Sequence, residues 1–94
     1  MVATYQVTLG SAATQVSATP VNARQVIFQN NSAANCRIGD NQVTTVGNGR
    51  GILLSAGAPG GSLNAGSLVA FNVNLADWYI YGTVGSVIDA LVID

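Results

Sequence analysis

The sequence predicts an all-β protein, a single small β-sandwich or barrel of about eight short strands. Three observations lead to this class. Apolar and polar residues alternate in one segment after another, which is the period of a half-buried strand. Turn signals rich in Gly, Asn, Asp and Pro separate these segments at the short intervals typical of sandwiches and barrels. No segment sustains a helical period, so we expect no helix longer than a turn or two.

The first expected strands lie before Pro20. Residues 3–9 alternate cleanly, and residues 14–18 give a weaker strand signal. This part of the chain is rich in Thr and Val and short of charge, so it is suited to add a strand to a neighbour's sheet edge. We therefore expect one domain over residues 1–94, in which residues 1–20 form an N-terminal arm or edge strands and residues 21–94 form the core module.

The strongest early strand signal covers residues 24–29, where three bulky apolar residues are contiguous. Residues 30–32 then break the pattern as a turn. The next expected strand covers residues 36–38 and carries the single cysteine, Cys36. We interpret Cys36 as a small core residue, because no neighbouring Lys or His would lower the pKa of its thiol.

The middle of the chain is dominated by turns. Residues 42–46 are expected to form a short strand, and the Asn48-Gly49 pair that follows is a hairpin signal because both residues accept a positive φ. Residues 52–54 are expected to form the next strand. Residues 55–66, with four glycines around Pro59, are expected to form a surface loop.

Three further strands are expected at residues 67–73, 78–81 and 87–93, the last two joined as a hairpin across residues 82–85. The last strand is apolar on both faces. We therefore expect it to be covered on both sides, either by sheets and a neighbouring subunit or deep inside one domain.

Asp89 interrupts one apolar face of this last strand. A buried carboxylate must be paired or hydrogen-bonded. We expect an arginine or backbone donors beside it, and Arg24 and Arg37 are the candidate side chains for a buried ion pair.

The charge composition argues against an enzyme. The 94 residues carry seven charged side chains, all Arg or Asp, and a net charge of −1, with no His, Lys or Glu. Without imidazole there is no Ser-His or Cys-His pair and no histidine metal ligand. We expect no catalytic residue, no metal site and no cofactor.

Nucleic acid and membranes are also poor candidate partners. Three scattered arginines cannot supply the phosphate contacts of nucleic-acid binding. No apolar run is long enough for a spanning helix, and the first residues do not resemble a signal peptide. Self-association is favoured instead, because a small domain with one cysteine and almost no net charge gains stability by sharing apolar surface.

The one aromatic concentration is at residues 78–81, where Tyr79 and Tyr81 face away from Trp78. The tyrosine face is either a contact surface for a partner or sugar, or a second buried face. We group Tyr79 and Tyr81 with Arg50 and Pro59, from the two glycine-rich segments, as the candidate partner interface.

Four segments together resemble small virion proteins of tailed bacteriophages, and capsid decoration (cement) proteins most of all. They are residues 24–31 (RQVIFQNN), 36–40 (CRIGD), 51–54 (GILL) and 77–80 (DWYI). The likeness covers roughly residues 20–94 and lies in strands and turns, so it transfers no ligand residue.

The resemblance implies a virion structural protein, made in the host cytoplasm, that stabilises the outside of the capsid. Its partners would be the major capsid protein, at junctions between subunits, and itself, as a trimer. The alternative is a tail or fibre component that binds host-surface carbohydrate through Tyr79, Tyr81 and nearby Asn and Asp side chains. A third hypothesis for the function is a cellular β-sandwich adaptor protein.

Overall fold

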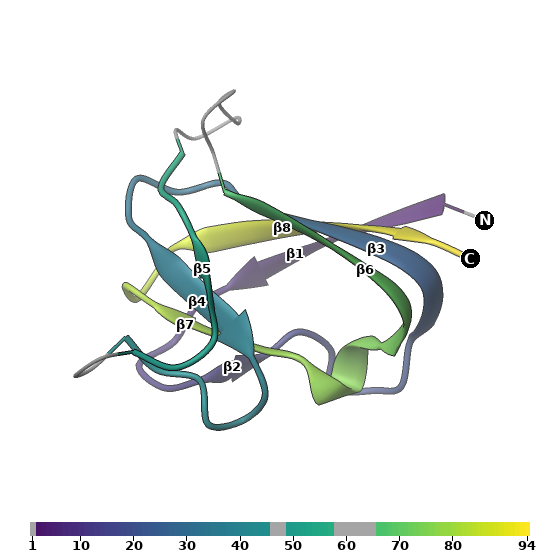
Figure 1. Cartoon of the computed structure of the whole chain (residues 1–94), viewed down its shortest axis with the longest axis horizontal. Coiled ribbons are helices and arrows are strands. Elements are labelled where there is room, and N and C mark those ends of the chain that lie inside the picture. The colour runs from purple at the N-terminus through teal and green to yellow at the C-terminus, as the bar shows by residue number, and fades with distance from the viewer. Residues whose placement is uncertain (1, 46–48, 58–65) are drawn as a thin grey trace.

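The fold is an antiparallel β-sandwich, in which two four-stranded sheets face each other across one core (Figure 1). The computed structural model describes residues 2–45, 49–57 and 66–94. The helical element within these residues is a single 3-10 turn, η1 (Leu75–Asp77). The all-β prediction is therefore confirmed.

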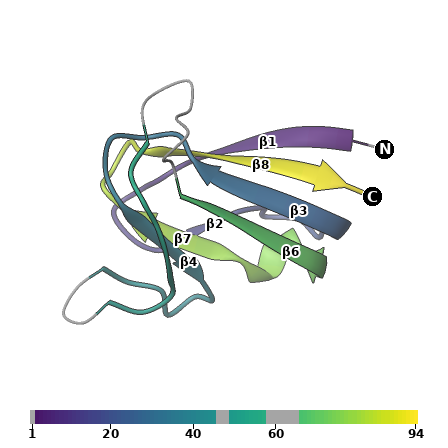
Figure 2. The same ribbon diagram turned by 45° about the horizontal axis from the view of Figure 1, so that its top comes forward.

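The first sheet has the strand order β1-β8-β3-β6. β8, the last of the strands in the chain, lies between β1 and β3, and all three pairings are antiparallel (Figure 2). The strands are β1 (Val2–Thr8), β8 (Val87–Ile93), β3 (Asn22–Asn30) and β6 (Ser67–Asn74).

The second sheet is smaller and has the order β2-β7-β4-β5. Its longest strands have four residues, and β2 and β5 at its edges are shorter still. The strands are β2 (Thr14–Gln15), β7 (Tyr79–Gly82), β4 (Cys36–Gly39) and β5 (Ile52–Leu54).

The core is formed by the alternate residues of both sheets that point inward, as the period-two pattern predicts. The Phe28 ring stacks on Trp78 with ring centroids 5.4 Å apart, which joins β3 of the first sheet to the entrance of β7 in the second. Cys36 is fully buried, as predicted. The buried cluster consists of Val7, Leu9, Ala23, Val26, Phe28, Cys36, Ile38, Leu54, Leu75, Ile80, Ile88, Ala90 and Val92.

One polar side chain, Asn30 at the end of β3, is fully buried among these apolar residues. Its Nδ2 donates to the carbonyl oxygens of Ala34 (2.9 Å) and Leu54 (3.1 Å), and its Oδ1 accepts from Ser32 Oγ (2.6 Å). The amide thus connects β3 to β5 and to the bend at residues 32–34 after β3. The sequence predicted this turn at residues 30–32, but residue 30 still belongs to β3.

The β3–β6 ladder is interrupted near one end, where Arg24 and Asn72 are not paired. Ala23 and Val26 both point into the core although they are three positions apart, so the alternation of β3 slips by one there. Asn72 on β6 has a φ of 54°. The chain continues from β6 directly into η1, where Asn74 Oδ1 accepts from the backbone N–H groups of Val21 and Ala76 (both 3.1 Å).

Two predicted elements are wrong. β7 and β8 do not form a hairpin across residues 82–85, because the chain crosses from one sheet to the other at this turn. Residues 42–45 form no strand. Their ladder contact is one isolated bridge between Thr44 and Arg50, and residues 46–48 of the expected hairpin turn lie outside the described residues.

The segment before Pro20 supplies edge strands, not a detached arm. β1 pairs along its whole length with β8, and β2 pairs with β7. The described part of the chain contains no helix long and apolar enough to span a membrane.

Candidate binding surface

The outward side of the first sheet, here called the outer face, is built from alternate residues of four strands. Their side chains line up in rows across the sheet, because neighbouring strands are held in register. Each row has one residue from β1, β8, β3 and β6, in that order. The first row contains Val2, Ile93, Gln25 and Phe71; the second contains Thr4, Leu91, Ile27 and Val69; the third contains Gln6, Asp89, Gln29 and Ser67.

The first two rows contain no charged side chain and six of their eight residues are apolar. Val2 and Phe71 are each 64% exposed and Val69 is 45% exposed. A shallow hollow of about 550 Å³ lies where these rows meet the polar third row, lined by Thr4, Ile27, Gln29, Ser67, Asp89 and Leu91. Contiguous apolar surface of this kind usually marks an interaction site.

This arrangement contradicts one of the two alternatives for β8, burial of both faces deep inside one domain; coverage by a neighbouring subunit stays a prediction. Ile88, Ala90 and Val92 face the core and are buried. The opposite side of β8 lies on the outer face and is half-buried, and no other described element packs over it.

Asp89 is held by amides, so the expected ion pair with Arg24 or Arg37 is wrong. Its two carboxylate oxygens accept from Gln6 Nε2 (3.0 Å) and Asn31 Nδ2 (3.1 Å). The β3–β8 register places Gln29 beside Asp89, so Arg24 lies five residues along the strand, roughly 17 Å away. Arg37 belongs to the other sheet.

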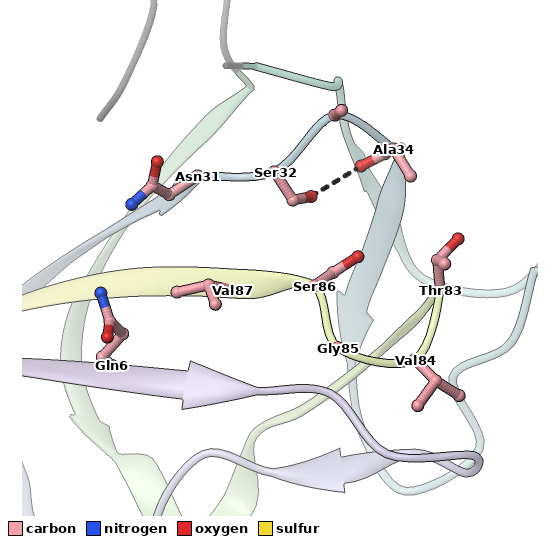
Figure 3. A pocket seen from close by; sticks show the side chains of 10 residues that line it. Gln6, Asn31, Ser32, Ala34, Thr83, Val84, Gly85, Ser86 and Val87 are labelled. Atoms are coloured by element: carbon pink, nitrogen blue, oxygen red, sulfur yellow. Dashed lines mark hydrogen bonds between the residues drawn. The ribbon is translucent and has the colours of Figure 1, made fainter. Parts of the chain in front are cut away.

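A second hollow, of about 510 Å³, opens at the end of the sandwich beside Gln6 and Asn31, the two residues that bond Asp89 (Figure 3). It lies between the turn after β3, the turn before β8 and the side chain of Gln6. No charged residue lines it. Ser32 at its wall is already engaged, since its hydroxyl donates to Asn30 and lies 3.1 Å from the Ala34 carbonyl oxygen. The hollow therefore offers only neutral hydrogen-bonding groups.

Tyr79 and Tyr81 lie on the outward side of the second sheet, where both are half-buried. Their neighbours in register are Gln15 beside Tyr79 and Arg37 beside Tyr81. The carboxylate and amides around Asp89 lie on the opposite face of the sandwich. The structure thus separates the tyrosines from the polar groups of the outer face.

The other two residues of the candidate interface do not join this tyrosine row. Arg50 is exposed at the base of the glycine-rich turn, where its backbone pairs with Thr44. Pro59 lies outside the described residues. Arg37 packs against Gly49 of the same turn and its Nη1 donates to the Gly51 carbonyl oxygen (2.9 Å), a contact that the sequence did not predict.

The described residues include no group of three or more acidic, His or Cys side chains placed to hold a metal ion. Burial raises the pKa of the Cys36 thiol from 9.0 to about 11, so at neutral pH the sulfur is protonated and a poor nucleophile. The chemistry that this surface offers is burial of apolar area with neutral hydrogen bonds.

Comparisons of the chain with protein-family models, with curated proteins and with solved structures found no match. Without such a match, the class of the protein is defined only by its fold and its exposed surface. That class is a β-sandwich in which one sheet face, with two mostly apolar rows, is covered by no described element.

Proposed function

We propose that the protein is a virion structural protein, a capsid decoration protein that binds the outside of a phage head at junctions between major capsid subunits. The observation that carries the proposal is the outer face, whose first two rows are uncharged and leave the apolar side chains of Val2, Phe71 and Val69 exposed. The resemblance of four sequence segments to decoration proteins supplies the identity of the partner.

The outer face is suited to bind a protein surface because little must be desolvated. Its one charged group, Asp89, keeps both of its hydrogen bonds to amides when a partner covers it. Apolar rows beside a polar third row resemble the core and rim of protein interfaces. Nucleic acid would instead require clustered positive charge.

A decoration protein needs no chemistry to stabilise a shell. A protein that binds only the assembled, expanded shell stabilises that state by its differential affinity, and the effect repeats at every site. Because the outer face carries a single charged group and the protein has a net charge of −1, many copies can bind side by side with little electrostatic repulsion.

Binding to heads that lack this protein tests the proposal. Phe71→Asp places a charge in the apolar row and should weaken binding at least about tenfold, or about 1.4 kcal/mol. Val84→Asp is the matched control, because Val84 is 66% exposed but lies in a turn outside the three rows. The proposal fails if purified protein does not bind expanded heads, or if both variants bind as the wild type does.

Carbohydrate binding by a tail or fibre protein remains the alternative. It was expected to use Tyr79 and Tyr81 together with nearby Asn and Asp side chains. In the structure the residues beside the tyrosines are Gln15 and Arg37, and both already bond to backbone carbonyls. A glycan array with specific hits that are lost in Tyr81→Ala would favour this alternative.

A further inference from the structure

The described strands leave four sheet edges, and β1 is the edge strand with the longest unbroken pairing to its neighbour. Proteins usually blunt an edge strand by making it short, by interrupting it or by adding charge or proline. β2 and β5 have two and three residues, and β6 is interrupted at Asn72. β1 lies at the edge of the first sheet beside β8 (Figure 2). It has seven residues in unbroken register with β8 and contains no charge, Pro or Gly.

The hydrogen bonds of the sheet determine which groups of β1 point outward. Leu9 N–H donates to the Ser86 carbonyl (2.9 Å), and residues of an antiparallel strand alternate between bonding and not bonding one neighbour. Asn31 N–H donates to the Val87 carbonyl (3.0 Å), which gives β8 the same alternation from its other side. Residues 3, 5 and 7 therefore bond β8, and the backbone groups of residues 2, 4, 6 and 8 face the open edge.

We infer that β1 pairs with β1 of a second copy of this chain, antiparallel and about a two-fold axis at Tyr5. Tyr5 is the middle residue of Val2–Thr8. A two-fold axis there places residues 2, 4, 6 and 8 opposite residues 8, 6, 4 and 2 of the other copy. Every outward N–H and C=O of the strand then meets a partner, and the two sheets become one continuous sheet.

The strand is self-complementary in its side chains as well. Like charges opposite each other destabilise a strand pair, and β1 has none. Tyr5 points toward the core side but is 38% exposed at the edge. In the dimer it lies opposite its own copy at a non-hydrogen-bonded position, where side chains approach most closely and aromatic pairs are favourable.

A two-fold interface closes at two copies. The oligomer is therefore a dimer, whereas the resemblance to decoration proteins implies a trimer. Pairing through β1 does not depend on whether the protein binds a capsid. One edge strand is smaller than a standard interface of about 1,600 Å², so we expect the dimer to dissociate in the micromolar range.

Sedimentation of the isolated protein tests the inference. The wild type should approach the mass of a dimer at about 100 µM and dissociate on dilution. Thr4→Pro removes an outward N–H without touching the β8 ladder and should shift the protein to monomer. Val69→Pro is the matched control, because Val69 lies in the same row as Thr4 but on the opposite edge and should leave the dimer intact. A wild type that stays monomeric, or forms a trimer that survives Thr4→Pro, would overturn the inference.

Cross-linking locates the axis even if the proline variant fails to fold. Opposed residues at a non-hydrogen-bonded position have Cα atoms about 4.5 Å apart, within disulfide range. Tyr5→Cys should therefore form a disulfide dimer under mild oxidation, and buried Cys36 should not interfere. Ala3→Cys is the control, since its two copies would lie roughly 13 Å apart along the strands. Equal cross-linking at both positions would contradict an axis at Tyr5.

Discussion

At the scale of single residues, the buried amide of Asn30 contributes to the specificity of the fold. Its amide is fully buried and makes three hydrogen bonds, to the Ala34 and Leu54 carbonyls and from the Ser32 hydroxyl. Buried polar groups that are fully satisfied favour one arrangement of their surroundings, because any slip leaves several groups unpaired. Asn30 therefore fixes how β3 of one sheet meets β5 of the other.

Asn30→Asp should destabilise the protein by at least about 3 kcal/mol at neutral pH, because it directs a buried carboxylate at two carbonyl oxygens. Burial raises the pKa of such a carboxyl in the folded state. The lost stability should therefore return in part as the pH falls and the carboxyl is protonated. Urea unfolding at several pH values checks this, with Asn41→Asp as an exposed control expected to change stability by less than about 0.5 kcal/mol. Equal behaviour of the two variants would contradict the role given to Asn30.

Cys36 should be inert in the native protein and should weaken the fold at high pH. Its folded-state pKa is raised from 9.0 to about 11, so its contribution to stability is complete below pH 9 and is lost as the pH rises toward 11. A thiol reagent at pH 8 should label the protein only after denaturation. Unfolding of Cys36→Ala should show a smaller loss of stability between pH 8 and 10.5 than the wild type. Rapid labelling of the folded protein would contradict the burial of this thiol.

At the scale of elements, the short second sheet depends on its turns. Gly49 and Gly51 flank Arg50 with positive φ values of 73° and 114°, and Arg37 from β4 holds this turn through the Gly51 carbonyl. A Cβ on Gly51 would lie 2.8 Å from the Ile38 carbonyl oxygen and 2.7 Å from Val43 Cγ2. Only glycine satisfies both the backbone angle and the close approach.

Gly51→Ala should therefore cost about 3 kcal/mol, the sum of backbone strain and a clash with β4. Gly85→Ala is the matched control. Gly85 also has a positive φ (87°), but a Cβ there would meet no atom within 4 Å, so we expect a cost of about 1 kcal/mol. The measurement is the free energy of unfolding of each variant. Similar losses of unfolding free energy in both variants would show that close contact with Ile38 and Val43 does not add to the cost at Gly51.

Local sequence patterns predicted most strands, because a strand is encoded by alternation and by the residues that end it. Residues 24–29 and 87–93 were expected and correspond to β3 and β8. The partners of the strands were not encoded locally. Residues 82–85 have the composition of a hairpin turn, yet β7 and β8 belong to different sheets, since pairing is decided by which apolar faces meet in the core.

The candidate surface was predicted less well for the same reason. The apolar outward side of β8 was visible in the sequence as a strand that is hydrophobic on both faces. Its alignment with Ile27 and Val69 depends on register between strands that are far apart in the sequence, since Leu91 pairs with Ile27 and Ile27 pairs with Val69. The sequence likewise could not show that Gln6 and Asn31, rather than an arginine, meet Asp89.

At the scale of the whole molecule, the sandwich has two unlike sides. The first sheet presents two mostly apolar rows, and the second presents two half-buried tyrosines, an arginine and the exposed Leu53. Paired β1 strands would place two outer faces in one continuous sheet. A surface doubled in this way would bind a repetitive partner with a higher apparent affinity than either copy alone.

If the protein decorates a phage head, it should be present in hundreds of copies per particle, as the many equivalent sites of a shell require. Heads assembled without it should form but rupture at a lower temperature or on osmotic shock, because they lose binding energy at every site. Quantitative mass spectrometry of purified virions and thermal release of DNA measure the two effects. A copy number of about a dozen or fewer would place the protein in the tail and favour the carbohydrate-binding alternative.

The position of β8 between β1 and β3 also determines when the first sheet can form during synthesis of the protein. β1 is synthesised before the other described strands, whereas its partner β8 is synthesised after them. The central pairings of the first sheet thus wait for residues 87–93, and contacts of such long sequence separation form slowly. During that wait β1 is an unpaired strand without charge, so nascent chains translated close together would find each other's β1 before their own β8.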